Sequence, residues 1–199
     1  MKKAGIHLYF VFFAVSVIIS CGKEDDANEY YPHANQMDTI IHNNIIRTFK
    51  LHVPASYSEN TKTALVIALH GYTSSATGME HGSGLNEKAD AEGFIVVYPN
   101  GLSYPWTASN PQAWNAGGGY EEWTGGTDDV GFIDKMLELI CKYYTIDRNR
   151  IFVTGHSNGS FMAYRLAYEL SGKIAAIAPH SGQMLYLPIK APTFRVSVL

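Results

Sequence analysis

The 199-residue sequence has only two cysteines, Cys21 and Cys141, which are too few for the disulfide framework of a small secreted domain. Only 17% of the residues are charged, the net charge is −3 and no basic run stands out, so the electrostatic footprint of a nucleic-acid-binding protein is absent. The sequence contains no H-E-x-x-H or C-x-x-C motif, so we expect no metal and no cofactor. By contrast, 46% of the residues are hydrophobic and 13% are aromatic, which suits one ordinary globular domain.

The first 20 residues have the pattern of a bacterial lipoprotein signal peptide. Lys2 and Lys3 precede an apolar run over residues 4–20, which is slightly shorter than the ~20 apolar residues of a membrane-spanning helix. The run ends in Ile-Ile-Ser before Cys21, which resembles a lipobox, and lipidation of Cys21 would leave acyl chains as the membrane anchor. A plain signal peptide with an incidental cysteine is the alternative. The lipobox predicts an exported protein that is anchored at the cell envelope, with the cell surface or the extracellular space as its location.

Residues 21–36 are polar, and we interpret them as a solvated tether between the anchor and the domain. The acidic stretch directly after Cys21 resembles a surface-export signal of bacterial lipoproteins, although an ordinary acidic linker fits it equally well. Lipidation would use one of the two cysteines, so Cys141 would have no partner and we predict no intrachain disulfide. The remaining residues, 37–199, are predicted to form a single domain.

This domain has the alternation of strands and helices that is typical of an α/β protein. Two continuous apolar runs, 64–69 and 94–98, have the length of strands, as expected for parallel strands that are covered by helices on both faces. The sequence therefore predicts a three-layer sandwich with a mostly parallel central sheet and right-handed crossovers. The other expected strands are 37–41, 45–53, 151–154 and 174–178, and the expected helices are 85–92, one that starts at 128, and 158–170.

Residues 155–159 form a G-x-S-x-G motif between a buried strand and an amphipathic helix. A serine on a tight strand-to-helix turn needs small residues two positions before and after it, and Gly155 and Gly159 meet that need. The turn is predicted to lift the hydroxyl of Ser157 out of the sheet above a helix N-terminus, which favours developing negative charge. We therefore interpret Ser157 as a nucleophile, with a purely structural turn as the alternative. The side chain of His156 is expected to point away from Ser157.

The segment after strand 64–69, His70-Gly71-Tyr72, complements this motif. Acyl-transfer hydrolases stabilise the tetrahedral oxyanion with two backbone N–H groups, one after the nucleophile and one after an early central strand. The sequence places the N–H of Asn158 and the N–H of Tyr72 at these positions, and Gly71 allows a close approach of the backbone. An ordinary turn after a strand is the alternative.

A long stretch from Gly101 to Gly126 is rich in Gly, Trp and Tyr, and loops of this length are usually functional. Its tryptophans are candidates for stacking on sugars or aryl groups, and we assign Trp114 as a substrate-binding residue; loop packing is the alternative. Asp128 and Asp129 follow at the start of a helix, where their charges are favourable, and we assign them no catalytic role. The other two tryptophans of the loop are Trp106 and Trp123.

Together, these motifs resemble the secreted poly(3-hydroxybutyrate) depolymerase and feruloyl esterase group of α/β-hydrolases, related to carbohydrate esterase family 1. The resemblance covers residues 45–182 and implies a serine carboxylesterase that acts on ester groups of plant polysaccharides or on polyesters. The matching segments are 69–71, 84–86, 93–101, 114–115, 128–132 and 155–159.

The residues that follow Ser157 depart from this group. The fold places the triad acid and then the histidine after the nucleophile, but this part of the sequence has no Asp, one Glu and one His. Glu169 lies about three turns along the helix, and His180 follows strand 174–178, where the family has no triad member. We therefore expect that the triad acid and histidine are not present in this chain and that the domain lacks its last strands and helices. We also expect strand 174–178 to be an uncovered edge, and the activity of the chain to be impaired.

Three functions remain open from the sequence. The first is a lipid-anchored serine esterase of the feruloyl or acetyl-xylan type, and the second is a polyester depolymerase with the same chemistry. The third belongs to another class, a non-catalytic surface lipoprotein that binds glycans through the Trp-rich loop. The expected partner is an ester substrate on a polysaccharide or polyester, with no nucleic acid and with membrane contact only through the lipid anchor. The oligomeric state stays open.

Overall fold

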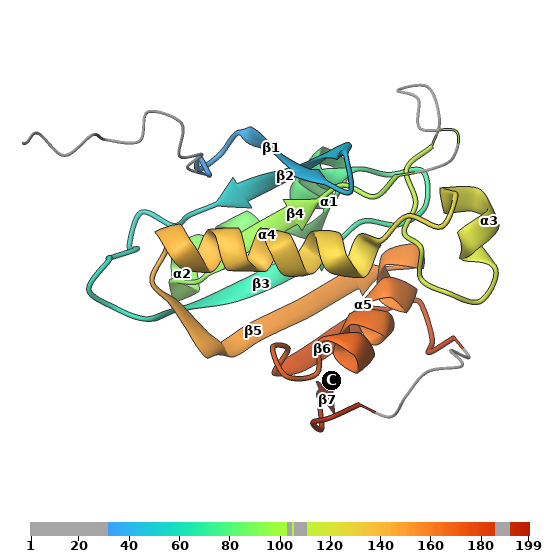
Figure 1. Ribbon diagram of the computed structural model, residues 1–199. Helices are drawn as coiled ribbons and strands as arrows, with labels where there is room; N and C mark the ends of the chain where they lie inside the picture. Colours follow the sequence, from blue (N-terminus) through green and yellow to red (C-terminus); the bar gives the residue numbers. More distant parts are fainter. Residues whose placement is uncertain (1–31, 103–104, 106–110, 186–191) are drawn as a thin grey trace, which may run out of the picture. The chain divides into compact units, whose positions relative to one another are not determined.

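In the part of the chain that the structure describes, seven strands form one sheet in the order β1-β2-β4-β3-β5-β6-β7 (Figure 1). β1 pairs antiparallel with β2, and β2 pairs antiparallel with β4. All neighbours from β4 to β7 are parallel. This confirms the predicted α/β fold with a mostly parallel central sheet. The strands are β1 (Met37–His42), β2 (Ile45–His52), β3 (Thr63–Leu69), β4 (Ile95–Pro99), β5 (Ile146–His156), β6 (Ala176–His180) and β7 (Ser197–Val198).

The computed structural model describes residues 32–102, 105, 111–185 and 192–199. All of these residues belong to one of the two units into which the chain divides, residues 31–199. The predicted signal peptide, Cys21 and most of the predicted tether lie outside the described residues, as does Trp106. Among the described residues, no helix combines the length and the apolar character that crossing a membrane requires.

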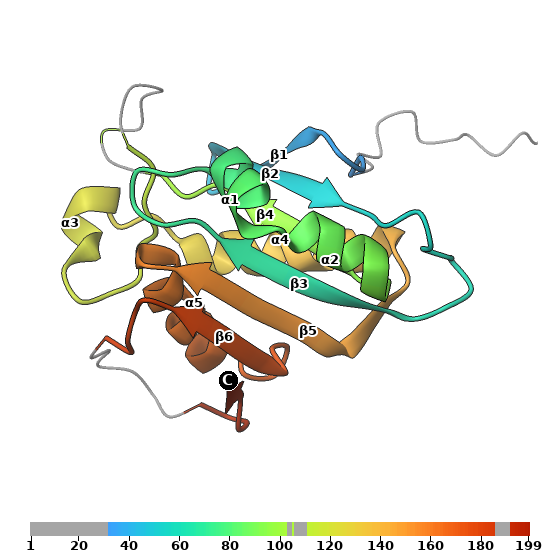
Figure 2. The ribbon, with the colours of Figure 1, turned by 180° about the vertical axis from the view of Figure 1, so that it is seen from behind.

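Helices cover the sheet on both faces. α1 and α2 lie on one face and α4 and α5 on the other, as the two opposite views show (Figures 1 and 2). The short helix α3 lies beyond the ends of the strands, at the end of the sheet where β5 leads into α5 (Figure 1). The helices are α1 (Ala76–Ser83), α2 (Leu85–Glu92), α3 (Tyr120–Thr124), α4 (Asp129–Tyr143) and α5 (Asn158–Glu169).

The burial of each strand explains its pattern of apolar and polar residues. Every residue of β4 is buried, because helices and neighbouring strands surround it, and this matches the continuous apolar run of its sequence. β2 lies nearer the edge, where the sequence alternates: Phe49 and Leu51 are buried, and Lys50 between them is partly exposed. The turn before β2 is made by Asn43 and Asn44, which both have positive φ angles, as a tight hairpin turn requires.

The edge of the sheet differs from the sequence-based expectation. The strand expected at 174–178 lies at Ala176–His180, and it is paired with β7 instead of being uncovered. The N–H of Leu199 donates to the carbonyl oxygen of Ile177 at 3.0 Å, and Ser197 donates to Ala175 at 3.4 Å. The Val-Ser-Val-Leu sequence of the last residues suits an extended strand, which explains why this segment satisfies part of the edge of β6.

Candidate active site

Ser157 lies on a strained turn between β5, which ends at His156, and α5, which begins at Asn158. Its backbone has φ 51° and ψ −116°, a conformation that non-glycine residues rarely adopt and that clusters at functional sites. Two hydrogen bonds stabilise the turn: the Ser157 N–H donates to the carbonyl oxygen of His180 at 2.9 Å, and the Ser160 N–H donates to that of Ser157 at 2.8 Å. The structure therefore forms the sharp strand-to-helix bend that the G-x-S-x-G motif predicts.

The two glycines of the motif are required by close backbone contacts. A Cβ atom on Gly155 would lie 2.3 Å from the carbonyl oxygen of Gly159. A Cβ atom on Gly159 would lie 2.4 Å from the carbonyl oxygen of Leu69, at the end of β3. Both contacts involve backbone atoms, which cannot rotate away as a side chain can. The bend therefore packs directly against the end of the neighbouring strand, and only glycine fits at either position.

The loop after β3 lies beside Ser157, as the sequence predicts. A Cβ atom on Gly71 would lie 3.5 Å from the Cβ atom of Ser157, so the backbone of this loop reaches the nucleophile candidate. Among the described residues, no acceptor receives a hydrogen bond from the peptide N–H of Tyr72 or of Asn158. Two peptide N–H groups flanking Ser157 are thus available to bind an oxyanion, and the N-terminus of α5 adds its positive dipole end.

The side chain of Asn158 attaches the bend to the long loop. Its Oδ1 accepts a hydrogen bond from the N–H of Trp114 at 2.7 Å, and its Nδ2 donates to the Trp114 carbonyl oxygen at 3.1 Å. The indole N–H of Trp114 donates to the carbonyl oxygen of His70 at 2.9 Å, and its side chain is completely buried. The expected role of Trp114 in substrate contact is therefore wrong, because the ring is a packing element under the loop.

His70 is a structural histidine with a neutral ring. Its Nε2 accepts a hydrogen bond from the N–H of Gly101 at 2.9 Å, which leaves the proton on Nδ1 to be donated to the carbonyl oxygen of Gly71 at 2.8 Å. Burial lowers the pKa of His70 to about 4. Both ring nitrogens are engaged by backbone groups, so His70 holds two loops together and has no free nitrogen to act as a base for Ser157.

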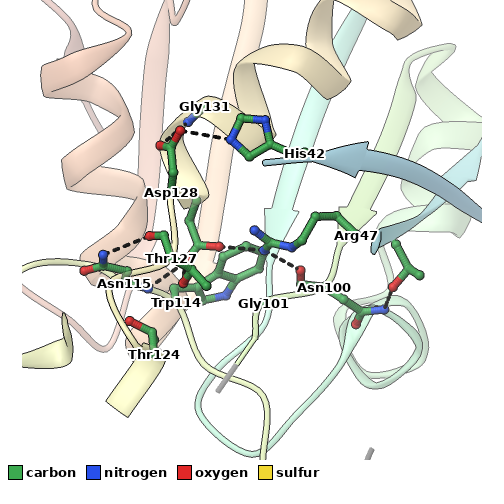
Figure 3. Close-up of polar contacts among 12 residues, drawn as sticks. His42, Arg47, Asn100, Gly101, Trp114, Asn115, Thr124, Thr127, Asp128 and Gly131 are labelled. Carbon is green, nitrogen blue, oxygen red and sulfur yellow. Dashed lines mark hydrogen bonds and ion pairs between the residues drawn. The ribbon is translucent and has the colours of Figure 1, made fainter. Parts of the chain in front are cut away.

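A buried ion pair joins β2 to α4, and Figure 3 shows the Arg47 side chain that forms it. Nη2 of Arg47, on β2, is 2.5 Å from Oδ1 of Asp129, on α4, and it also donates to the carbonyl oxygen of Asn100 at 3.0 Å. The guanidinium carbon lies 4.0 Å from the centroid of the Phe132 ring. Asp129 is therefore more than the helix-start charge that its sequence position predicts. Its carboxylate is fully buried, and the guanidinium of Arg47 compensates its charge.

The same carboxylate positions the loop. Oδ2 of Asp129 accepts from the N–H of Asn115 at 2.7 Å, and the Asn115 side chain donates to the carbonyl oxygen of Thr127 at 2.9 Å. Arg165 of α5 donates to the carbonyl oxygen of Asn115 at 2.7 Å. Burial raises the pKa of Asp129, and Arg47 and the Asn115 N–H oppose that effect. Residue 115 adjoins Trp114, so this network is connected to the Asn158 clamp at the bend.

Asp128 behaves as the sequence predicts. It is the N-cap of α4, and its Oδ1 accepts from the N–H of Gly131 at 2.8 Å. Its Oδ2 lies 2.9 Å from Nε2 of His42, at the end of β1 (Figure 3). Partial burial works against its ionisation, but the hydrogen bonds from Gly131 and His42 outweigh this and lower the pKa of Asp128. The contact fastens the first hairpin to α4, away from Ser157.

A cavity of about 690 Å³ opens beside Ser157. His156 and His180 are among its lining residues, and their rings lie 6.0 Å apart. The described residues contain four contacts between a histidine and a carboxylate, and none of their members lines this cavity. The cavity is lined by Gly71, Tyr72, Ser74, Gly78, Met79, Gly82, Ser83, Leu85, Thr154, Gly155, His156, Ser157 and His180.

Comparison with known proteins identifies an esterase family and relatives that are named as esterases. The family described as Esterase PHB depolymerase matches residues 48–190. A bifunctional acetylxylan esterase/xylanase of Neocallimastix patriciarum is 29% identical over 155 residues, which cover 75% of this chain and 21% of that protein. Feruloyl esterase B of Neurospora crassa is 32% identical over 124 residues, which cover 61% of this chain and 40% of that protein. The chain thus spans less than half of the length of these curated relatives.

The fold is also found among solved structures. An acetyl xylan esterase from Aspergillus awamori superposes with a TM-score of 0.57 at 19% identity, over 80% of this chain and 58% of that protein. At this identity the likeness concerns the fold, and it agrees with the mixed, mostly parallel sheet described above. The elements that carry the bend at Ser157, β5 and α5, belong to the region that the family match covers.

Proposed function

The chain belongs to the Esterase PHB depolymerase family, and from that membership we propose that it is a serine carboxylesterase that cleaves esters on plant polysaccharides. The observation that carries this proposal is the strained bend at Ser157, with two unengaged peptide N–H groups and a cavity of about 690 Å³ beside it. The relatives named for feruloyl and acetylxylan esterase activity support the substrate class.

The proposed reaction proceeds in two steps at Ser157. Its Oγ attacks the carbonyl carbon of the ester, and the carbonyl oxygen becomes an oxyanion that the N–H groups of Tyr72 and Asn158 stabilise. Collapse of this intermediate expels the alcohol, which takes up a proton, and leaves an acyl group on Ser157. Water then attacks the acyl carbon in the same way and releases the carboxylic acid, which restores the serine hydroxyl.

The proton of the Ser157 hydroxyl requires a base, since a neutral hydroxyl is a poor nucleophile. His156 and His180 line the cavity, and none of the described residues that line it carries a carboxylate. We propose that the described residues supply the nucleophile and the oxyanion site without a complete triad. An oxyanion site without a triad leaves only ~10³–10⁴-fold catalysis over water, so the described residues by themselves are expected to support only slow turnover.

Labelling with a fluorophosphonate tests the nucleophile separately from turnover. Because no complete triad activates its hydroxyl, we expect the probe to modify Ser157 slowly but faster than other exposed serines. Peptide mass spectrometry after a long incubation would show this modification, and Ser157→Ala is expected to abolish it. Ser58→Ala is the matched control, because Ser58 is exposed in a loop outside the cavity. Equal labelling of the Ser157→Ala protein would refute the proposal.

Hydrolysis assays distinguish the substrates. Release of acetate or ferulate from acetylated or feruloylated xylan supports a polysaccharide esterase. The family description also names PHB depolymerase, so polyester cleavage is the second candidate. Release of 3-hydroxybutyrate from its short oligomers, without release of acetate or ferulate, would favour that candidate. We further propose that the protein is exported and anchored by a lipid on Cys21.

A further inference from the structure

Four aromatic side chains from three segments lie together beside the Ser157 cavity. The ring centroids of Tyr72 and Trp123 are 5.5 Å apart, and those of Tyr120 and Trp123 are 5.4 Å apart. Phe161 of α5 lies 5.9 Å from Tyr120. We call Tyr72, Tyr120, Trp123 and Phe161 the aromatic platform. Tyr72 also lines the cavity, so the platform and the cavity are continuous.

Two of the four members of the platform are exposed to solvent, and the other two, Tyr120 and Phe161, are partly buried. Trp123 is 52% exposed and Tyr72 is 42% exposed, whereas Trp114 of the same long loop is completely buried. Trp114 packs the loop against the domain. The exposed position of Trp123 is not explained by such packing. An exposed group of aromatic rings next to a cavity is typical of a surface that binds a ligand.

The surroundings of the platform favour a saccharide. Glu121 and Glu122 lie exposed in the first turn of α3, and the rings themselves carry hydroxyl and indole N–H groups. A pyranose presents a flat C–H face that packs on an aromatic ring and hydroxyls that need water or polar partners. Apolar polyester units and free aryl groups are better served by an enclosed pocket, which buries most of their surface. An open aromatic surface that is bordered by polar groups matches the amphipathic character of a sugar.

We infer that the aromatic platform is a saccharide-binding subsite, which holds the sugar chain while its ester group enters the Ser157 cavity. This inference rests on the proposed function for the position of the ester, but the binding of the sugar itself does not depend on turnover. α3 lies beyond the strand ends on the side where β5 leads into α5, so a chain on the platform is next to the bend (Figures 1 and 2). Trp123 is the central residue, because it contacts both tyrosines.

Calorimetric titration of the full chain carrying Ser157→Ala tests the subsite without hydrolysis. The probes are xylohexaose, methyl ferulate and a trimer of 3-hydroxybutyrate. We expect saturable binding of xylohexaose, weakened at least about tenfold by an added Trp123→Ala and retained with Trp123→Phe. Tyr72→Ala is a second variant that is expected to weaken binding. Ile46→Ala is the matched control, since Ile46 is a 66% exposed side chain on β2, outside the platform, and should leave binding unchanged.

Three results would overturn the inference: no binding of xylohexaose, unchanged binding in both the Trp123→Ala and Tyr72→Ala proteins, or preferential binding of the ferulate or hydroxybutyrate probe. Denaturation curves measured on each variant show that it is folded before titration. Failure of the proposed function is visible separately, as fluorophosphonate labelling of Ser157 that is no faster than that of the exposed Ser58 in the otherwise unchanged chain. Xylohexaose binding without such labelling would keep the subsite and reject the esterase.

Discussion

Single glycines decide whether the bend at Ser157 can form. A methyl group on Gly155 would lie 2.3 Å from a backbone oxygen, whereas a methyl group on Gly82 of α1 would meet no atom within 4 Å. The same chemical change therefore has opposite consequences at the two positions. At Gly155 the backbone of α5 must move, and at Gly82 the helix simply loses a flexible residue.

Gly155→Ala is expected to destabilise the protein by at least about 2 kcal/mol, because the new methyl group forces the bend apart. Gly82→Ala is the control and should stabilise it by up to about 1 kcal/mol through helix propensity. Urea denaturation followed by circular dichroism measures both free energies of unfolding. A Gly155→Ala protein as stable as the original would contradict the close contact at the bend.

The buried histidine His70 predicts a dependence of stability on pH. Burial lowers its pKa to about 4 in the folded protein, whereas an unfolded chain has the ordinary value of 6.5. Because the unfolded state takes up the proton first, the free energy of unfolding falls as the pH drops from about 6.5 to about 4. Complete linkage over this interval amounts to about 3 kcal/mol.

Comparison with His70→Gln isolates this contribution. The variant is expected to be less stable at pH 7.5, because it loses the ring contacts to Gly71 and Gly101, and the difference from the unchanged protein should shrink toward pH 4. Urea denaturation at pH 7.5, 5.5 and 4 measures the difference. A constant difference across these pH values would show that His70 does not titrate as its burial implies.

At the scale of elements, the Arg47–Asp129 pair connects strands, helices and the long loop. It joins β2 to α4, and through Asn115 it reaches the loop and Arg165 of α5. Neither partner contacts the cavity, but the adjoining Trp114 is clamped by Asn158 at the bend. The pair is therefore connected, through Asn115 and Trp114, to the bend that carries Ser157.

Asp129→Asn is expected to cost about 3–5 kcal/mol, because it leaves the Arg47 guanidinium buried without a countercharge. The double change Arg47→Met with Asp129→Asn should recover much of this loss, since it keeps an acceptor for the Asn115 N–H and removes the buried charge. Urea denaturation gives the stability, and the rate of fluorophosphonate labelling gives the reactivity of Ser157.

Glu92→Gln is the surface control, because the Lys88–Glu92 pair is exposed and its loss should not be detectable. Equal stability of the Asp129→Asn and Glu92→Gln proteins would reject the role of the pair.

Local sequence patterns predict the bend at Ser157, but they do not predict contacts between residues that are far apart in the sequence. The G-x-S-x-G motif lies between its own strand and helix, so its geometry follows from neighbouring residues, and the positive φ of Ser157 agrees with it. Arg47 and Asp129 are 82 residues apart, and no sequence pattern joins them. The alternation in β2 places Arg47 on the same buried face as Phe49 and Leu51, but it gives no sign of which carboxylate lies beside it. Tertiary packing alone determines that Asp129 is the buried partner of Arg47.

Aromatic composition is similarly ambiguous. The sequence marks the long loop as rich in tryptophan, but it does not separate Trp114, which is buried, from Trp123, which is 52% exposed. The two residues share the same loop and similar glycine-rich surroundings. Their roles differ because Trp114 finds a buried acceptor in the carbonyl oxygen of His70, while Trp123 contacts Tyr72 at the surface. The short helix α3, which carries Trp123, has only five residues and too little periodicity to be predicted.

At the scale of the whole molecule, the residues before the folded unit determine where an esterase of this kind would meet its substrate. Polysaccharide esters are extracellular polymers, so a chain that cleaves them must leave the cytoplasm. The run of apolar residues before Cys21 and the polar residues after it predict export, lipid attachment and a solvated tether. A single acyl chain binds membranes only weakly, and stable anchoring needs more than one.

Cys21→Ser tests this prediction in a bacterial host that is fed radiolabelled palmitate. We expect the unchanged protein to incorporate label and to sediment with membranes, and the Cys21→Ser protein to lose the label and to become releasable. Cys141→Ser is the matched control, because Cys141 is a partly buried thiol of α4 and should leave labelling unchanged. Release of an unlabelled, unchanged protein into the medium would instead identify a plain signal peptide. In that case the lipid anchor would be ruled out, and binding of xylan by the proposed aromatic platform would have to contribute to the retention of the protein at its polymer.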